Sequence, residues 1–205
     1  MTLLSAPPGF GIPDFNAPLD IAALLAAVPS TATFKGTIAQ STIETLKRAG
    51  KPAPKSYVVF RDYPMKELME LNVDAAKQLF PDQPLREGVR RLGRSVFPTF
   101  TQTLLGKVMY GVFGGNPSAV LKLANKSYDM TQNTGRVTTL ATSSRSVTLR
   151  FSSTYTILSS YHYGILEGTL QALGFAGLIG FHPLSEIDGE FFVAWEPRLE
   201  SVAQP

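Results

Sequence analysis

Cysteine is absent from this chain of 205 residues, and histidine occurs only at His162 and His182. The lack of cysteine excludes disulfides, thiolate metal sites and a cysteine nucleophile, and it is compatible with a reducing compartment. Two histidines without thiolates are a poor donor set for zinc, which takes several nitrogen or sulfur ligands at one place. We therefore expect no metal site, and we expect a cytoplasmic location.

Charge is also scarce, and no apolar run is long enough to cross a bilayer. Charged residues make up 17% of the chain and the net charge is +3, which is too small to indicate a nucleic-acid partner. The most apolar stretch, residues 164–181, is interrupted by Glu167 and Gln171 and falls short of the roughly 20 apolar residues of a membrane helix. No basic segment precedes the apolar run at residues 21–28, so a secretory signal is not expected. These features predict neither a nucleic-acid partner nor a membrane span.

The N-terminal half has the pattern of helices. Prolines and glycines in residues 1–17 predict an irregular arm, and residues 18–205 are expected to form a single domain. The strongest helical signal is an apolar stripe with a spacing of three or four residues from Leu85 to Val108. Pro98 lacks an N–H group and disfavours helix at the preceding residue, so we expect two helices there. The expected helices are residues 18–28, 37–49, 64–71, 72–80, 84–97, 99–113 and 117–126.

In the C-terminal half the period of the apolar residues changes to two. Residues 137–142 and 147–151 have the alternation of a β-hairpin, and so do residues 176–182 and 190–196. A helix at residues 161–173 is expected between them. The sequence therefore predicts an α+β fold in which a helical N-terminal half packs on a C-terminal antiparallel ββαββ unit.

Several short motifs resemble those of a paralogous family of myxobacterial proteins of unknown function. They are DYP at 62–64, LFPDQP at 79–84, RRLGR at 90–94, TLLGK at 103–107, and the residues Gly164, Gly168, Gly174 and Trp195. The predicted order of elements is also similar to that of haem-NO-binding, vinyl-reductase-type and TRAPP-like domains. This resemblance implies a non-enzymatic ligand-binding, sensory or assembly domain that acts in signalling.

The same resemblance raises the question of a haem cofactor. Haem-NO-binding domains use an axial histidine from their helical half, whereas no histidine precedes His162 in this chain. We therefore predict no cofactor.

A small apolar ligand is the partner that the resemblance favours. Its cavity is expected between the helix pair that meets at Pro98 and the C-terminal sheet, where the apolar faces of both halves converge. The expected lining residues are Phe100, Leu104, Val108 and Tyr110, with Tyr161 and His162 as polar contacts. The alternative is that the same side chains fill this space completely as core.

Motifs for catalysis are missing from the sequence. There is no G-x-S-x-G nucleophile turn and no phosphate-binding loop, and no pair of carboxylates has a spacing that indicates acid–base chemistry. We therefore predict no catalytic residues and no enzyme. The alternative hypothesis is an enzyme that uses His162 with Glu167 or Asp188.

Two further patterns bear on partners. Arginines recur at four-residue intervals and share one helical face, which is either a solvated surface or a site for an anion or an acidic protein partner. These residues are Arg86, Arg90 and Arg94. Paired glycines allow helices to approach closely, either within the chain or in a homodimer, which we favour by analogy with the similar folds. The glycines are Gly106, Gly111, Gly164 and Gly168.

Overall fold

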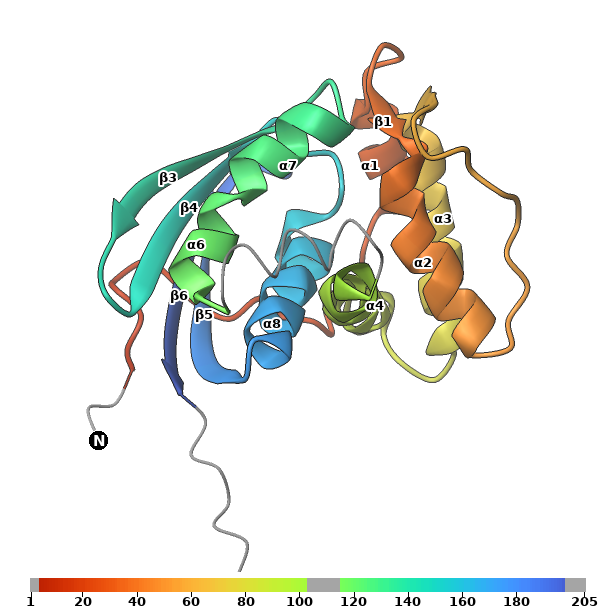
Figure 1. The fold of residues 1–205 in the computed structure, drawn as a ribbon. Coiled ribbons are helices and arrows are strands. Elements are labelled where there is room, and N and C mark those ends of the chain that lie inside the picture. The colour runs from red at the N-terminus through yellow and green to blue at the C-terminus, as the bar shows by residue number, and fades with distance from the viewer. Residues whose placement is uncertain (1–3, 103–114, 198–205) are drawn as a thin grey trace, which may run out of the picture.

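The fold is seen in a computed structural model, which describes residues 4–102 and 115–197 (Figure 1). Helices form one side of the molecule and an antiparallel sheet forms the other, with α4 and α8 between them. The α+β class and the helical half followed by ββαββ are therefore confirmed. Two hydrophobic cores exist, one among the N-terminal helices and one between the sheet and the helices that cover it.

The helical half is built from amphipathic helices and one small pair of strands. Its helices are α1 (Ile21–Ala27), α2 (Gly36–Arg48), α3 (Met65–Leu79) and α4 (Leu85–Thr101). Strands β1 (Thr33–Lys35) and β2 (Asp62–Pro64), which we did not predict, pair antiparallel ahead of α2 and α3. The apolar faces of α2, α3 and α4 meet in the first core, which includes the fully buried Phe34, Leu46, Met65, Leu68 and Leu92.

Helix α3 corrects one prediction. We expected Asn72 to cap a second helix, but α3 continues through it as one helix of 15 residues. Asn72 is buried, and its side-chain oxygen accepts a hydrogen bond of 2.8 Å from the hydroxyl of Thr42 on α2. A tertiary partner satisfies the amide oxygen, so this residue does not need to end the helix.

Helix α4 corrects a second prediction, because it runs without a break through Pro98. Proline inside a helix costs about 3 kcal/mol through a lost hydrogen bond and a steric clash. Val89 and Leu92 are fully buried before the proline, and Thr99 is buried after it, so tertiary packing holds both sides in one helix. The second helix that we expected, residues 99–113, lies largely outside the described residues.

The C-terminal half is a four-stranded antiparallel sheet with helices against it. Helices α6 (Pro117–Lys122) and α7 (Ala124–Thr131) replace the single helix expected from 117 to 126. The strands are β3 (Arg136–Thr142), β4 (Ser146–Ser152), β5 (Phe175–Pro183) and β6 (Gly189–Pro197), in the order β3-β4-β6-β5. A π-helical turn, η1 (Leu158–His162), leads directly into α8 (Tyr163–Ala172). Both predicted hairpins and the predicted helix between them are confirmed.

The two halves meet where α4 crosses α8 at very short distance. A Cβ atom added to Gly164 would lie 2.0 Å from the carbonyl oxygen of Arg90, and one added to Gly168 would lie 2.1 Å from that of Arg94. Gly93 on α4 approaches the carbonyl oxygen of Tyr161 in the same way, at 2.1 Å. Gly164 and Gly168 thus serve contacts within the chain, which removes them as an argument for a homodimer, and Gly106 and Gly111 lie outside the described residues.

Residues 4–17 of the N-terminal arm lie against the sheet and form no helix. Gly11 exchanges two backbone hydrogen bonds with Phe181 on β5, of 3.0 and 2.8 Å. Further along the arm, Phe15 packs edge-to-face on Tyr163 of α8 and lies under the guanidinium of Arg90. The arm therefore covers the open edge of β5 and reaches the boundary between the halves.

Within residues 4–102 and 115–197, no helix has the length and apolar character needed to span a bilayer. The apolar stretch at residues 164–181 is divided between α8 and β5. It therefore supplies a packed helix and a strand of the second core.

Candidate functional site

A cavity of about 280 Å³ lies at the boundary between the two halves. Its described walls come from α2, α4, α6, α7, β4, η1 and α8, so both halves of the fold contribute. Aliphatic and aromatic side chains dominate the lining, and its polar groups are hydroxyls, one amide and one imidazole. Among the described residues that line the cavity, none is charged.

The π-helical turn η1 places two aromatic residues at this wall. It is preceded by Ile157, whose φ of 53° lies in the left-handed region. A β-branched residue rarely adopts this conformation, and such strain costs about 1–3 kcal/mol. The side chain of Ile157 is buried in the first core, which holds the backbone in this state. The strained entry and the wider π turn bring Tyr161 and His162 to the cavity.

His162 is buried, and protein groups face both of its ring nitrogens. The hydroxyl of Tyr128 on α7 makes a hydrogen bond with Nε2, and the hydroxyl of Thr156 lies 3.4 Å from Nδ1. The ring also packs edge-to-face against Phe151 of β4, with centroids 5.2 Å apart. Burial lowers the pKa of His162 to about 4, against a smaller opposing effect of a hydrogen bond with the backbone of Thr156. The imidazole is therefore neutral at pH 7.

The two tyrosines of the site keep their protons. Burial raises the pKa of Tyr128 above the ordinary range of a phenol, although the residue as a whole keeps some exposed surface. Burial also raises the pKa of Tyr161 to about 12. Thr42 and Asn72 lie close enough to oppose this rise, but neither completes a hydrogen bond of good geometry with the Tyr161 hydroxyl. The site thus presents neutral groups that can donate or accept a hydrogen bond.

The structure places the predicted ligand contacts as follows. Tyr161 and His162 are at the wall of the cavity, and their contact with a ligand stays a prediction. The side chain of Phe100 and the residues Leu104, Val108 and Tyr110 lie outside the described residues. Sequence analysis missed Tyr128, which is 34 positions from His162 and shares no motif with it. The only signal for it was an aromatic residue two positions after the helix predicted at residues 117–126.

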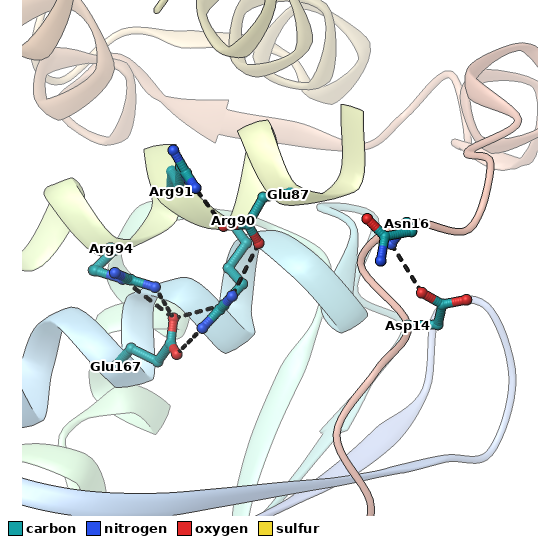
Figure 2. Close-up of polar contacts among 7 residues, drawn as sticks. All are labelled: Asp14, Asn16, Glu87, Arg90, Arg91, Arg94 and Glu167. Carbon is teal, nitrogen blue, oxygen red and sulfur yellow. Dashed lines mark hydrogen bonds and ion pairs between the residues drawn. The ribbon is translucent and has the colours of Figure 1, made fainter. Parts of the chain in front are cut away.

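The arginine stripe forms an ion-pair network between α4 and α8 (Figure 2). Arg90 donates two hydrogen bonds to Glu167, of 2.9 and 2.5 Å, and one of 2.9 Å to Glu87. Arg94 donates to the same Glu167 at 3.2 Å, and Arg91, next to the stripe, pairs with Glu87. Carboxylates of the chain itself therefore pair with these arginines, and a contact of the stripe with an anion or an acidic partner stays a prediction.

Arg86, the first member of the stripe, also has partners within the chain. It donates to the carbonyl oxygen of Pro18 at 3.1 Å and to the hydroxyl of Ser159 at 2.8 Å. An anion at these arginines would compete with groups already in place. Arg86 instead ties the segment just before α1 to the π-helical turn.

The groups of the enzyme hypothesis are not brought together. Glu167 faces Arg90 and Arg94, as Figure 2 shows. Asp188 lies in the turn between β5 and β6, where it accepts a hydrogen bond from the hydroxyl of Ser185 and another from the backbone N–H of Ser153. The partners described for His162 are the hydroxyls of Tyr128 and Thr156 and the backbone of Thr156, so neither carboxylate orients the imidazole.

Solved structures with a similar fold are H-NOX proteins. The K. algicida H-NOX protein in its Fe(II) unliganded state matches with a TM-score of 0.57 at 11% identity, over 80% of this chain and 98% of that one. A variant of Tt H-NOX matches with a TM-score of 0.60 at 15% identity, over 81% and 97%. A variant of the S. oneidensis H-NOX protein gives 0.52 at 18%, over 80% and 92%. Identities this low show a shared fold.

Other matching structures concern haem distortion in the H-NOX family, so the fit of a haem to this chain can be examined. Haem needs an axial ligand, and its propionates suit cationic side chains. The side chains that could serve as axial ligand are poorly suited to it. Nε2 of His162 is hydrogen-bonded to Tyr128, and the raised pKa values of Tyr128 and Tyr161 disfavour a phenolate ligand. Met130 is largely exposed. No arginine or lysine is among the described lining residues. In the part of the chain that the structure describes, no three His, Cys, Asp or Glu side chains gather as for a metal ion. The described residues of the cavity do not fit a haem.

Sequence comparison identifies the family. No curated protein matches this sequence. The model of a family described as proteins of unknown function, DUF2378, matches residues 30–196. This range includes all the described helices and strands from β1 to β6, apart from the last residue of β6. This chain, with its H-NOX-like fold and its cavity at η1, therefore belongs to the DUF2378 family.

Proposed function

We propose that this protein is a non-enzymatic sensory domain that binds a small molecule in the cavity between its two halves. The observation that carries the proposal is the strained π-helical turn, which holds the neutral imidazole of His162 at the wall of a 280 Å³ cavity. Strained backbone is retained where the surrounding structure over-determines it, and it concentrates at functional sites. A cavity at the junction of two packed units is also a common position for a ligand site.

The fold supports a sensory role. One of the matching structures is an oxygen-binding H-NOX domain related to soluble guanylate cyclases, with a TM-score of 0.53. Because the cavity has walls in both halves, a ligand would contact α2 and α4 on one side and α7 and β4 on the other. Binding there can change the equilibrium between arrangements of the halves only if the ligand binds one arrangement more tightly. Likeness to vinyl-reductase-type and TRAPP-like domains, homodimerisation and an acidic protein partner stay predictions.

The test is mass spectrometry of the full chain purified from cells, first under native conditions and then after denaturing extraction. We expect a mass above the 22.2 kDa of the chain and a released small molecule. Ala124 lines the cavity, so Ala124→Trp should fill it and abolish the added mass. Ala26 is exposed on α1, so Ala26→Trp is the matched control and should retain it. A wild-type protein that carries no ligand and binds none in titrations would contradict the proposal.

A further inference from the structure

The chemistry of the cavity narrows the class of ligand, on the basis of the proposed function. An apolar protein cavity of about 150 Å³ accommodates benzene. The cavity here is 280 Å³, so at the same filling it takes a molecule of about a dozen non-hydrogen atoms. A porphyrin is several times larger than benzene and exceeds this space.

The electrostatics of the wall point to an uncharged molecule. The described lining residues carry no charge, and the arginines of the α4–α8 network are paired with Glu87 and Glu167. Transfer of an ion from water into such surroundings is unfavourable unless a partner of opposite charge is present. An anionic ligand would find no cation at the described wall, and a cationic ligand would find no carboxylate.

The polar groups of the wall suit one hydrogen-bonding group on the ligand. Tyr128 and His162 are joined by a hydrogen bond, and the side chains of Gln132, Thr154 and Thr156 also lie near the Tyr128 hydroxyl. The Nδ1 atom of His162 has only a long contact of 3.4 Å with the hydroxyl of Thr156, so it can still engage a further group. The phenol and the imidazole are both neutral and are held by Phe151 and Thr156. A ligand hydroxyl or carbonyl can bond to such a pair without a change in charge.

We propose that the ligand is an uncharged, mainly apolar molecule of about bicyclic size, with one hydroxyl or carbonyl group that bonds to Tyr128 and His162, and that this domain does not bind haem. This inference departs from the haem chemistry of the structures that share the fold. It rests on the size, the charge and the donor set of the cavity.

The test compares probes of nearly equal size by isothermal titration calorimetry with the full chain. The probes are naphthalene, 1-naphthol and 1-naphthoate, and hemin is titrated separately by its Soret absorbance. We expect 1-naphthol to bind one to one and about five- to tenfold more tightly than naphthalene, which is the usual gain from one buried hydrogen bond. Naphthoate should bind at least tenfold more weakly than 1-naphthol, and hemin should give no saturable Soret shift.

Variants assign the effect to the site. Tyr128→Phe should remove the difference between 1-naphthol and naphthalene while naphthalene still binds. Tyr155 lies outside the described lining, so Tyr155→Phe is the matched control and should retain the difference. Circular dichroism and urea unfolding check that both variants are folded.

The outcomes separate the ligand class from the proposed function. If hemin binds one to one and Ala124→Trp blocks it, or if naphthoate is the tightest probe, the ligand class proposed here is wrong and the ligand-binding function stands. If the Tyr128→Phe variant keeps the full preference for 1-naphthol, the assigned polar contact is wrong. If neither these probes nor hemin bind and the chain carries no ligand from cells, the function and the ligand class are both overturned. If such a ligand is present and is charged or is a haem, only the ligand class is wrong.

Discussion

Helix α8 and the π turn before it have two sides that differ sharply in packing. On one side, Gly164 and Gly168 lie against the backbone of α4 with no room for a methyl group. On the other side, Tyr161, His162 and Thr169 border a cavity of 280 Å³. Protein interiors are normally packed as densely as organic crystals, so a gap beside so tight a contact is uncommon. The difference indicates that the close contact with α4 fixes the position of α8, while another side of α8 borders the cavity together with the later part of α4.

The largest effect is expected on the tight side, from Gly164→Ala. Alanine favours helix by about 1 kcal/mol over glycine, which alone would stabilise α8. However, the added Cβ would lie 2.0 Å from the carbonyl oxygen of Arg90, and backbone atoms cannot move aside cheaply. We expect the clash to prevail and the free energy of unfolding in urea to fall by about 3 kcal/mol or more.

Gly11→Ala is the control for this prediction, because a Cβ at Gly11 would meet no atom within 4 Å. Its free energy of unfolding should change by less than about 0.5 kcal/mol. A stabilised Gly164→Ala variant would show that α4 and α8 are farther apart than described.

The next effect belongs to the cavity side and depends on pH. The pKa of His162 is about 4 in the folded chain, because burial disfavours the imidazolium, and an unfolded histidine has a pKa of about 6.5. Between these values the unfolded state binds more protons, so stability falls as the pH decreases from about 6.5 to about 4 and then levels off. The total loss is expected to approach about 3 kcal/mol.

Urea unfolding of wild type and His162→Gln across this range measures the contribution. The variant should lose less stability on acidification, and the difference between the two curves reports His162 alone. Parallel curves would mean that the imidazole is not buried in the neutral form.

Acidification below this range tests the network at the α4–α8 crossing. Burial tends to raise the pKa of Glu87, but hydrogen bonds from Arg91 and Arg90 outweigh it and lower the pKa overall. A carboxylate whose pKa is lowered by folding stabilises the fold at pH values above its pKa in the unfolded chain. This contribution is lost as the pH falls through its pKa in the folded chain.

Pairwise replacement of Arg90 and Glu167 measures the central ion pair of that network. Both side chains are about one-fifth exposed, so solvent screens them in part. We expect a double-mutant cycle with Arg90→Met and Glu167→Gln to give a coupling energy of about 1–2 kcal/mol. The same cycle with Arg48 and Glu44, an exposed pair on α2, should give less than about 0.5 kcal/mol. Equal coupling energies for the two pairs would show that the α4–α8 crossing does not strengthen the ion pair of Arg90 and Glu167.

The smallest effect is expected from Thr169→Val, one residue beyond Gly168 but facing the cavity. The Thr169 hydroxyl donates to the carbonyl oxygen of Ile165 in its own helix, and valine has nearly the same shape. The free energy of unfolding should fall by less than about 1 kcal/mol in Thr169→Val. It should fall clearly more in Gly168→Ala, because the added Cβ would meet the backbone of Arg94. Similar losses from both changes would remove the contrast between the two sides of α8.

The sequence by itself determined the local elements of this fold. Both hairpins and α8 were predicted close to their observed bounds, because alternation and glycine turns act over a few residues. The four-residue spacing also placed the arginines on one helical face. The prediction failed at Asn72 and Pro98, where local preference favours a boundary but the burial of neighbouring residues in the core holds the helix together.

Only the tertiary structure decided the site and the use of its residues. Tyr128 meets His162 because α7 and η1 pack on the same strand, a long-range event without a sequence signature. Ile157 adopts a left-handed conformation against the preference of its side chain, and only the surrounding core can impose it. The arginines became an internal network because Glu167, 77 positions after Arg90, lies across the α4–α8 crossing. A cavity is the space that packed elements leave between them, so its size follows from how the elements fit together and not from any one segment of the chain.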